Sequence, residues 1–358
     1  MIPPPFINNI FSQFVSLNGK LDAVELTSGL INNTYKLNTP NGKTFLLQKI
    51  NTKVFHEYDK LMTNVFIISE HINKKLKSIK NIEYVNPEFY TTLDKRYYYK
   101  DDDNNIWRLS EFIDNNKPDL EDKKTIANEA GKILATFHFL TNDIDTDSIY
   151  ETIPGFHNIK LRWNKLLTVT KKNNPRYNES KDIFNKIRSF EYLINEFEEL
   201  MHSNSLPLRI VHNDPKLSNI LFRNNKAISL IDPDTIMPGY LPADFGDAVR
   251  SLCNTTDENE TNIEKVGFDI DSFQAFTKSY LEIMNPLLIS NELNSLAVFP
   301  LIITMEQLIR FYTDYIEGDI YYQTNYPKHN LNRSLVQLKL LESMSTYFEQ
   351  MQIFIMEN

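Results

Sequence analysis

Cysteine is nearly absent from this chain. Cys253 is the only cysteine among 358 residues, so no disulfide can form within the chain, and a reducing compartment is expected. Targeting and membrane signals are also lacking. Residues 1–6 carry no basic segment, no long apolar segment follows them, and the uncharged apolar stretch at residues 296–305 is too short to cross a bilayer. We therefore expect a cytoplasmic protein with no signal peptide and no membrane partner.

Basic charge is also in short supply. Lys and Arg number 38 against 47 Asp and Glu, which gives a net charge of −9 and a pI near 5.4. Proteins that bind the phosphate backbone of nucleic acids need the opposite balance, so a nucleic-acid partner is not expected. The chain shows no internal repeat and no long low-complexity linker, and nothing in it implies a protein partner.

What the chain does have is the length and composition of a globular protein with two domains. It is 41% hydrophobic and 24% charged, which is ordinary for a folded protein of this size. Its first part is typical of short strands with turns and the rest of helices, which indicates a segregated α+β fold. The change falls near residues 114–118. We predict an N-terminal lobe with a small antiparallel sheet at residues 1–113 and a larger, mostly helical lobe at residues 114–358.

Local patterns predict individual elements. Asn41-Gly42 between two alternating runs predicts a hairpin, and residues 101–105 predict the tip of a second one. A mixed helix is predicted over residues 56–79, and apolar residues recur at helical spacing from Leu120 onwards. The remaining helical segments are predicted at residues 180–201, 271–285, 291–317 and 330–356.

The most informative stretch is the run His212-Asn213-Asp214-Pro215-Lys216-Leu217-Ser218-Asn219. It puts a carboxylate, Asp214, and an amide, Asn219, five positions apart on one loop. Residues 220–222 and 227–231 are apolar, strand-like runs joined by a polar turn, so they predict a hairpin that returns the chain to the loop. Asp232 ends the return strand and is expected to meet the other two. Three oxygen-bearing side chains that meet where the hairpin returns to the loop suit a hard cation such as Mg²⁺.

Kinases with a protein-kinase-like fold need such a set. One acid accepts the proton of the substrate hydroxyl, while an amide and a second acid hold Mg²⁺ on the nucleotide phosphates. For any single residue of the set, a solvated loop or a helix cap is the plainer interpretation. The whole string between two strand-like runs favours the catalytic one.

In such a kinase the first hairpin covers the phosphates of ATP. Here residues 28–34 join the first two strands with a single glycine, so backbone amides and the side chains of Asn32 and Asn33 would make those contacts. An ordinary hairpin turn is the alternative. Glu111 to Ile113 would form the hinge that binds adenine through backbone groups, and a plain core strand is the alternative there.

A lysine on the third strand should pair with the phosphates. The run at residues 45–50 offers Lys49 on one face of the strand and Gln48 on the other, because side chains alternate along a strand. We prefer Lys49. Its helix partner stays open between Glu57 and Glu70.

The run from His212 to Asn219, followed by Ile231-Asp232-x-Asp234-Thr235, resembles the aminoglycoside phosphotransferase-like superfamily of small-molecule kinases. Further strings are similar to its N-acetylhexosamine 1-kinase branch. They are Leu46 to Asn51, Trp107-Arg108, Ile153 to His157, Met237-Pro238-Gly239, Asp244 to Asp247, Arg310 to Asp319, and Tyr326 to Arg333. The resemblance covers nearly the whole chain.

The resemblance implies a reaction and roles for individual residues. ATP would give its γ-phosphate to the anomeric 1-hydroxyl of N-acetylglucosamine or N-acetylgalactosamine, producing the sugar 1-phosphate. Asp214 matches the catalytic base, and Asn219 and Asp232 match the Mg²⁺ ligands. Asp234 is close enough in the chain to take part in metal or sugar binding, and Lys216 would neutralise charge on the transferring phosphoryl group.

The sugar is expected to bind on the helical lobe, opposite Asp214. Polar side chains in otherwise apolar or aromatic segments are the candidates, and they are Arg310, Asp314, Asp319, His329 and Arg333. Arg310 and Asp314 are four residues apart, so a pair on the helix surface is the alternative for them. His157 and Arg162 rank lower.

The sequence Asp244-Phe245-Gly246 matches the magnesium-binding triplet of protein kinases. Asp232 ends the return strand of the hairpin and is expected to take that role, so we expect Asp244 to cap a helix or to brace the Asp214 loop.

Three other functions are compatible with these residues. They are another small-molecule kinase of the superfamily, acting on an aminoglycoside, choline, homoserine or another sugar, a non-catalytic nucleotide-binding protein, and a helical scaffold.

Overall fold

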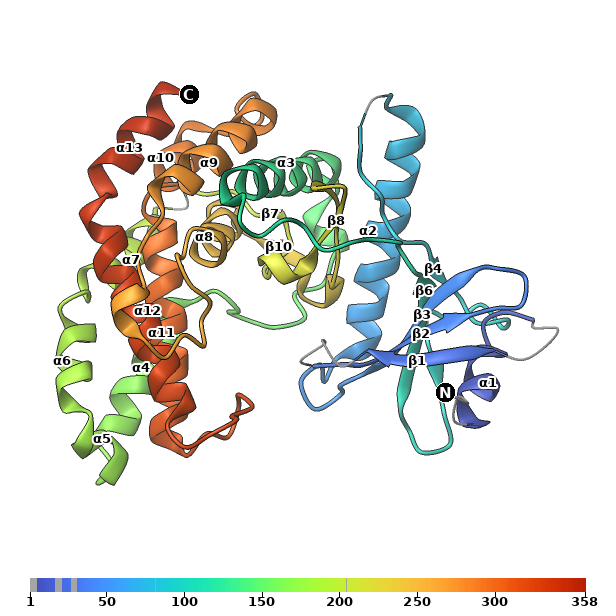
Figure 1. The fold of residues 1–358 in the computed structure, drawn as a ribbon, viewed down its shortest axis with the longest axis horizontal. Coiled ribbons are helices and arrows are strands. Elements are labelled where there is room, and N and C mark those ends of the chain that lie inside the picture. Colours follow the sequence, from blue (N-terminus) through green and yellow to red (C-terminus); the bar gives the residue numbers. More distant parts are fainter. Residues whose placement is uncertain (1–4, 17–20, 27–30, 81, 204) are drawn as a thin grey trace. The chain divides into compact units, whose positions relative to one another are not determined.

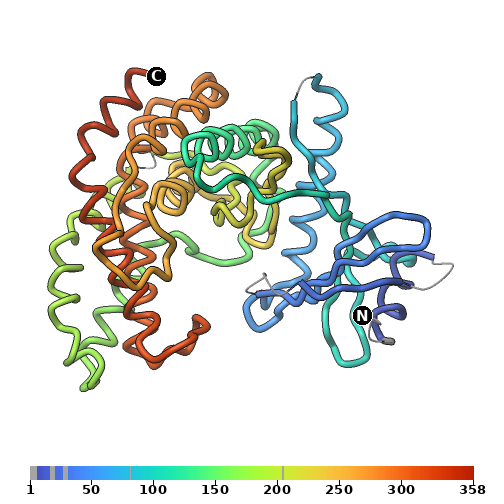
Figure 2. The backbone as a smooth tube through the Cα atoms, viewed as in Figure 1, coloured from blue at the N-terminus to red at the C-terminus, as the bar shows by residue number. Residues whose placement is uncertain are grey.

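The computed structural model describes residues 5–16, 21–26, 31–80, 82–203 and 205–358 (Figures 1 and 2). The chain divides into two compact units. The first comprises Met1–Lys117, Leu140–Ile153 and Asp232–Pro238, and the second comprises Pro118–Phe139, Pro154–Ile231 and Gly239–Asn358. The first segment of the first unit ends at Lys117, whereas the predicted N-terminal lobe ended at residue 113. The first unit also includes two later segments that the prediction had placed in the helical lobe.

The first unit is built on an antiparallel sheet with the strand order β1-β2-β3-β6-β4, and β5 also pairs with β6. A short helix and a long helix accompany it. The elements are α1 (Pro5–Phe11), β1 (Asp22–Leu26), β2 (Asn33–Asn38), β3 (Thr44–Ile50), α2 (Tyr58–Ser78), β4 (Phe89–Tyr90), β5 (Tyr99–Lys100), β6 (Ile106–Glu111), and the 3₁₀ turns η1 (Thr146–Ser148) and η3 (Pro233–Thr235).

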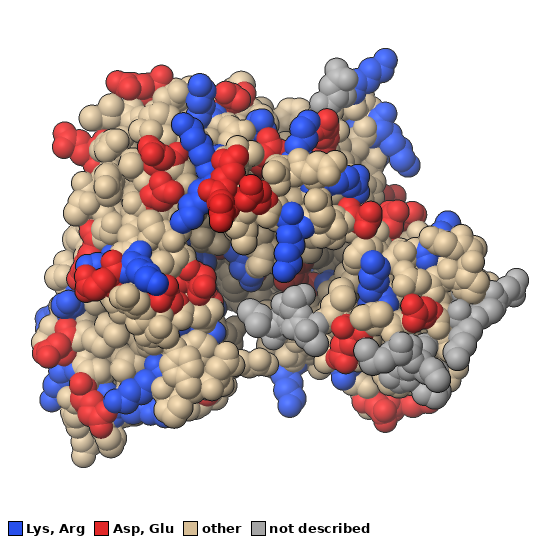
Figure 3. Space-filling model, viewed as in Figure 1, with Lys and Arg blue, Asp and Glu red and all other residues tan. Residues whose placement is uncertain are grey.

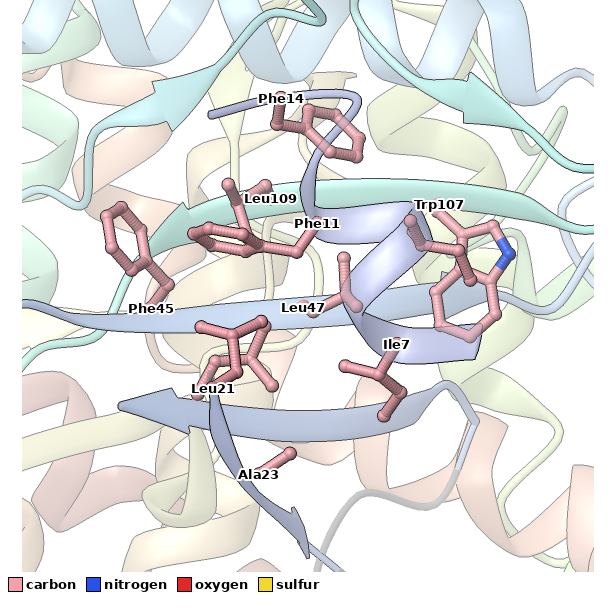
Figure 4. Packing of buried hydrophobic residues seen from close by; sticks show 11 residues of the cluster. Ile7, Phe11, Phe14, Leu21, Ala23, Phe45, Leu47, Trp107 and Leu109 are labelled. Atoms are coloured by element: carbon pink, nitrogen blue, oxygen red, sulfur yellow. The ribbon is translucent and has the colours of Figure 1, made fainter. Parts of the chain in front are cut away.

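Alternation along β3 and β6 gives the sheet two different faces. On one face Phe45 and Leu47 of β3 and Leu109 of β6 are buried against Phe11 of α1, as Figure 4 shows. This cluster excludes water because apolar side chains from the helix and from the strands interdigitate there. The predicted hairpin between β2 and β3 is confirmed, and its Gly42 has the positive φ that such a turn requires.

The opposite face of the sheet packs against α2. Ile50 of β3 and Ile106 of β6 join Leu61, Met62 and Val65 of the helix in a second apolar cluster. These helix positions recur at three- and four-residue spacing, which is why the segment folds as an amphipathic helix. The helix predicted over residues 56–79 is therefore confirmed.

The second unit is mostly helical. At its centre α11 packs against α4, α8 and α12, and it is buried along nearly its whole length (Figure 1). The elements are α3 (Lys123–Thr141), α4 (Ile159–Thr170), α5 (Pro175–Glu179), α6 (Lys181–Arg188), α7 (Tyr192–His202), β7 (Arg209–Val211), η2 (Leu217–Asn219), β8 (Ile220–Arg223), β9 (Lys226–Leu230), β10 (Met237–Gly239), α8 (Leu241–Leu252), η4 (Ile263–Lys265), α9 (Ile270–Met284), α10 (Ser290–Ser295), α11 (Phe299–Glu317), α12 (His329–Thr346) and α13 (Phe348–Glu357).

Three of the predicted helices are broken in the structure. The segment at 291–317 divides into α10 and α11 because Pro300 has no N–H to continue a helix, and it sits in the first turn of α11 instead. The segment at 180–201 divides into α6 and α7 where the N–H groups of Ser189 and Phe190 bond three residues back. The segment at 330–356 divides at Tyr347 into α12 and α13. The helix predicted at 271–285 is confirmed as α9.

The surface carries charges of both signs. On the face drawn in Figure 3, the Lys and Arg side chains are interspersed with Asp and Glu. Among the residues that the structure describes, no helix is long and apolar enough to cross a membrane.

Candidate active site

The loop that follows β7 is held by a buried carboxylate. Asp244 on α8 accepts the backbone N–H groups of His212 and Asn213, each at 2.6 Å, and its Oδ2 lies 2.9 Å from Nε2 of His138. Asp244 and His212 are fully buried, and His138 is nearly so. Asn213 has a φ of 63°, a left-handed conformation that Asn tolerates better than most residues. The loop geometry is therefore fixed from within the helical unit.

This contact decides between the two roles expected for Asp244. The role as a brace of the loop is confirmed, since its carboxylate spans two consecutive backbone N–H groups. The role as a helix N-cap is wrong, because Tyr240 holds that position and Asp244 lies inside the first turn of α8.

The two oxygens of the Asp214 carboxylate have different surroundings. Its Oδ2 accepts Nζ of Lys216 at 2.5 Å and Nδ2 of Asn219 at 3.0 Å. Its Oδ1 accepts no hydrogen bond from the residues that the structure describes, and the side chain keeps 27% of its surface exposed. One oxygen is thus anchored while the other can accept a proton from a bound molecule.

Asn219 is oriented by the same contacts. Its amide donates to both the backbone oxygen and the carboxylate of Asp214, at 2.9 and 3.0 Å, which turns its Oδ1 away from that residue. Its backbone oxygen accepts the N–H of Ile231 at 2.8 Å, which extends the predicted β8–β9 hairpin by one rung. Asp232 follows Ile231 in the chain and has a left-handed backbone conformation, with a φ of 67°.

The donor set of Asn219 and Asp232 fits a hard divalent cation. One amide oxygen and one carboxylate are oxygen ligands, and Mg²⁺ in nucleotide sites is commonly held by one or two protein ligands with phosphate oxygens supplying others. No cluster of three or more His, Cys, Asp or Glu side chains in the described part of the chain could hold a metal ion by itself.

His212 links the loop to the end of β9. Its Nε2 lies 3.0 Å from the backbone oxygen of Ile231 and donates to it. Burial lowers the pKa of His212 below its usual 6.5, against the opposing charges of Asp244 and Asp214. The ring is therefore neutral near pH 7, and it holds the loop beside the residue that precedes Asp232.

A pocket opens beside Asp214 within the second unit. It is lined by Phe156, His157, Asn213, Asp214, Asp247, Arg250, Ile303, Glu306, Gln307 and Arg310. Of the six residues expected to bind an acceptor, Arg310 is the one that lines it. Its guanidinium carbon lies 5.7 Å from the ring centres of Phe156 and Tyr322, and its Nη1 donates to Oε1 of Gln307 at 3.2 Å. The alternative pair of Arg310 with Asp314 does not form.

The acidic side chains of the pocket are each matched by a base. Arg250 donates to Asp247 at 2.8 Å. Glu306, which is 1% exposed, lies 3.3 Å from Nδ1 of His157 and 3.5 Å from Nε of Arg162. Burial acts to lower the pKa of His157, but the hydrogen bond and the charge of Glu306 outweigh it and raise that pKa above 6.5.

The other expected acceptor residues on the second unit tie together the segment between α11 and α12. Asp314 accepts the backbone N–H groups of Ile320, Tyr321 and Tyr322, at 3.0, 2.8 and 3.0 Å. The remaining contacts serve the same segment. Asp319 contacts Arg176 and Asn330, the ring of His329 accepts the backbone N–H of Asn325, and Arg333 donates to the backbone oxygen of Gln323.

The residues expected to bind nucleotide lie on the first unit. Lys49 shares its face of β3 with Phe45 and Leu47, as the alternation predicted, and it forms no ion pair with the residues described. Neither Glu57 nor Glu70 is its partner; Glu57 pairs with Lys60 instead, at 2.7 Å.

The remaining nucleotide candidates stand at strand ends. Asn33 begins β2 opposite Lys49. At the end of β6, the N–H of Glu111 donates to the backbone oxygen of Glu88, and the backbone oxygen of Ile113 accepts the Asn115 side chain. Ser28 to Leu30, the first part of the expected phosphate-covering turn, lie outside the described residues.

Asp234 lies in a buried polar cluster of the first unit. One carboxylate oxygen pairs with Arg108 of β6, and the other accepts Nδ2 of Asn32 at 2.6 Å. Asn32 in turn accepts the backbone N–H of Asn51 at 2.9 Å. The side chains of Asp234 and Asn32, expected to bind ligands, are thus bonded to each other.

Sequence reasoning named Asp214, Arg310 and the lower-ranked His157 among the residues of the pocket, but it missed the other charged ones. Asp247 and Arg250 stand on the same face of α8 as Asp244, at three-residue spacing, and Glu306 stands four residues before Arg310 on α11. Charged residues on a helix that is otherwise buried are the signal that could have found them. Arg108 carried the same signal, as a charge in the middle of an apolar strand.

The fold is similar to that of solved kinases. Over 98% of this chain and 96% of the other, it matches an aminoglycoside phosphotransferase from Alicyclobacillus acidocaldarius, with a TM-score of 0.64 at 14% identity. A choline kinase from Cryptosporidium parvum matches with a TM-score of 0.61 at 16% identity, over 96% of each chain. An amicoumacin kinase, solved with AMP-PNP, Ca²⁺ and its substrate, matches with a TM-score of 0.61 at 12% identity, over 94% of this chain and 93% of that one. The predicted α+β, protein-kinase-like fold, with an antiparallel sheet and a mostly helical C-terminal part, is confirmed.

The sequence itself assigns the family. The profile of the phosphotransferase enzyme family (APH) matches residues 22–275, which is more than half of the chain and includes β1 through α9 up to Ala275. The match contains both the loop around Asp214 and the helix that braces it. The chain belongs to the phosphotransferase enzyme family.

Proposed function

We propose that this protein is an ATP-dependent small-molecule kinase that phosphorylates the anomeric 1-hydroxyl of an N-acetylhexosamine, N-acetylglucosamine or N-acetylgalactosamine. The observation that carries the proposal is the carboxylate of Asp214. One oxygen is held by Lys216 and Asn219, the other has no partner among the described residues, and the residue lines a pocket. Membership of a phosphotransferase family supports the reaction type, and the sequence strings around the site support the sugar.

Asp214 acts as the base in this scheme. It accepts the hydrogen of the acceptor hydroxyl and aligns the oxygen with the γ-phosphorus, since positioning provides much of the catalysis in phosphoryl transfer. Lys216 holds the second carboxylate oxygen at 2.5 Å and adds positive charge where the phosphoryl group passes.

Asn219 and Asp232 would hold Mg²⁺ on the phosphates of ATP. The ion would neutralise charge on the phosphates when bound. Asn219 contributes Oδ1, because its amide protons are already given to Asp214. For the nucleotide we retain the backbone from Glu111 to Ile113 at the adenine. Asn33 and Lys49 share the face of the sheet that packs against α1, whereas Arg108 on the other face contacts the turn that follows Asp232, so Asn33 and Lys49 would reach the phosphates only from the end of their strands. The Asn32 side chain is already bonded to Asp234, so Asn32 would act through its backbone.

The charges of the pocket favour a neutral acceptor. Asp214, Asp247 and Glu306 each face at least one basic side chain, so no acid is left over to bind a cation. Arg310 faces a neutral amide and two aromatic rings. Burial acts to lower the pKa of Arg310, but the interactions with Tyr322 and Glu306 outweigh that effect and raise the pKa above its usual value. The guanidinium therefore keeps its charge. A hexosamine with an uncharged N-acetyl group fits this balance, whereas an aminoglycoside or choline would need unpaired carboxylates or an open aromatic cage.

We assign the other predicted acceptor residues to the frame of the site. Asp314 and Asp319 are occupied by bonds to the segment that follows α11, and His329 and Arg333 share the Asn259 side chain. These four residues would influence the acceptor only through the position of that segment.

The test is phosphate transfer from ATP and Mg²⁺ to a panel of acceptors, namely N-acetylglucosamine, N-acetylgalactosamine, glucose, galactose, kanamycin, choline and homoserine. The proposal expects turnover on the two N-acetylhexosamines, with an acid-labile 1-phosphate as the product. Turnover confined to kanamycin or choline would keep the phosphotransferase and reject the sugar. Absence of turnover on every member would reject this acceptor class as a whole.

A further inference from the structure

Arg108 is a buried charge that the proposed chemistry does not use directly. It lies in the middle of β6, opposite Gln48 of β3, and is 1% exposed. Its Nε donates to Oε1 of Gln48 at 3.0 Å and its Nη1 pairs with Asp234, which is 3% exposed. Its Nη2 is buried and has no hydrogen-bond partner among the described residues.

Such a pair is a poor device for stability alone. Taking two charges out of water costs more than their attraction returns in many proteins, and an apolar pair of similar volume is often as stable. The unpartnered Nη2 adds a further desolvation cost. A buried pair with this geometry is therefore better explained by what it holds in place.

What the pair holds is the short turn η3. Asp234 is its middle residue, and Asp232 is the residue immediately before it, in a left-handed conformation at φ 67° and ψ 65°. The same turn is fixed on its other side, where Nδ2 of Asn64 on α2 donates to the backbone oxygen of Ile236 at 3.4 Å. Asp232 is thus the first residue of a segment whose later residues are tied to β6 and α2.

We propose that Arg108 and Asp234 form a positioning pair that sets the direction of the Asp232 carboxylate, and with it the affinity of the site for a divalent cation. The inference rests on the proposed function, because it takes Asp232 as a ligand of that cation. Asp234 is then an anchor and not a ligand. Both of its oxygens are engaged, one by Arg108 and the other by Asn32 at 2.6 Å.

The Arg108–Asp234 pair can act on a carboxylate it does not touch because η3 is a single short turn that begins with proline. Asp232 and Asp234 are separated by Pro233, whose φ is fixed by its ring. A change in the orientation of Asp234 therefore also changes the orientation of Asp232. Groups that orient a metal ligand typically change metal affinity 10- to 100-fold when they are removed.

The experiment measures Mn²⁺ bound to the protein–ADP complex by electron paramagnetic resonance, which needs no acceptor and no turnover. The double variant Arg108→Met/Asp234→Leu replaces the pair with apolar side chains of similar size and should remain folded. We expect its Mn²⁺ affinity to fall about tenfold or more, with the affinity for metal-free ADP unchanged. Arg108→Lys keeps the charge and should recover part of the loss, since Lys can meet Asp234 but not Gln48 as well.

Two further variants separate the outcomes. Asp232→Asn should lose Mn²⁺ affinity, and adding Arg108→Met/Asp234→Leu to it should cost little more, because the pair acts through Asp232. Arg209→Met/Glu292→Gln disrupts an ion pair of the second unit in which Glu292 is fully buried and Arg209 partly buried, and it should leave Mn²⁺ binding unchanged. Circular dichroism and melting of every variant establish that it is folded.

Three results would overturn the inference. Wild-type Mn²⁺ affinity in the folded Arg108→Met/Asp234→Leu variant would show that the pair does not position the ligand. Weaker binding of metal-free ADP in that variant would make Arg108 a phosphate ligand instead. An unchanged Mn²⁺ affinity in Asp232→Asn would remove the metal assignment itself, a failure that belongs to the proposed function and takes the positioning role with it.

Discussion

At the scale of single residues, the pocket beside Asp214 is a set of compensated charges. Glu306 is almost fully buried, and its Oε1 lies within ion-pair distance of Nε of Arg162, at 3.5 Å, but accepts no hydrogen bond from the described residues. Its Oε2 depends on His157 at 3.3 Å. The protonation state of one histidine therefore controls how much negative charge the pocket presents.

This coupling predicts the titration of His157. Glu306 raises the pKa of His157 above 6.5, so the stability that the pair adds is fully present below pH 6.5 and is lost as the pH rises through the raised pKa. Glu306→Gln should lower that pKa, as followed by NMR of the histidine ring. Glu317→Gln, on the same helix but paired with Lys165, is the matched control and should leave it unchanged. A His157 that titrates identically in all three proteins would refute the coupling.

Substitutions of Arg310 and Arg333 can be compared directly, because the two side chains have similar aromatic contacts but different positions relative to the pocket. Both guanidinium groups lie over aromatic rings, but Arg310 lines the pocket and Arg333 is bonded to Asn259 and Asn330. Arg310→Met should raise the KM for the acceptor by about tenfold, since a hydrogen bond to a charged group contributes about 1.5–3 kcal/mol. Arg333→Met should leave that KM within about twofold. Steady-state kinetics at saturating ATP checks both, and a larger effect at Arg333 would move the acceptor site away from the pocket.

At the scale of elements, hairpins were easier to predict than helix ends. Asn41-Gly42 and the polar turn before Lys226 specify their hairpins locally, and Asn224 and Asn225 take the positive φ values that such a turn needs. The long helical segments were predicted to be continuous because their apolar spacing continues across the breaks. Pro300 gave a local signal of a break, whereas Tyr347 is a residue type that helices accept, so nothing in the local sequence marks the break there.

Helix packing predicts an intolerant glycine. A Cβ added to Gly131 of α3 would lie 2.3 Å from the backbone oxygen of Phe276 and from Oγ of Ser279, both on α9. Gly131→Ala should therefore lower the free energy of unfolding by about 1–3 kcal/mol, although alanine favours an isolated helix. Gly267→Ala, whose nearest neighbours would be 3.7 Å away, should change it by less than about 0.5 kcal/mol. Denaturant unfolding measures both, and equal effects would contradict the close approach.

At the scale of the whole molecule, the sequence showed the order of the parts and the chemical string, but not which segments belong together. Asp214, Asn219 and Asp232 could be found because they are close in the chain and a hairpin joins them. Asp247, Glu306 and Arg108 carried only the signal of a charge in a buried segment, and where they lie in the fold depends on packing between distant segments, as for Arg108 with Asp234. The assignment of Asp232–Pro238 to the first unit follows from those same contacts.

The single cysteine predicts a probe of unfolding for the chain. Cys253 is fully buried, and burial raises the pKa of its thiol well above 9.0, so the native protein holds little thiolate. We expect negligible reaction with a thiol reagent under native conditions and one reactive thiol per chain in denaturant. Dithiothreitol should not change the melting temperature, since no disulfide can form within the chain. Rapid labelling of the native protein would show that the helical unit opens at Cys253.

The central claim is that Asp214 serves as the base for phosphate transfer to a hydroxyl bound in the adjoining pocket. The most direct test compares the kcat of wild type and Asp214→Asn on the best acceptor of the panel, with circular dichroism and ADP affinity as controls for folding. We expect kcat to fall by at least about 10²-fold, since groups that act on developing charge contribute on that order. Turnover close to wild type in a folded Asp214→Asn that still binds ADP would contradict it.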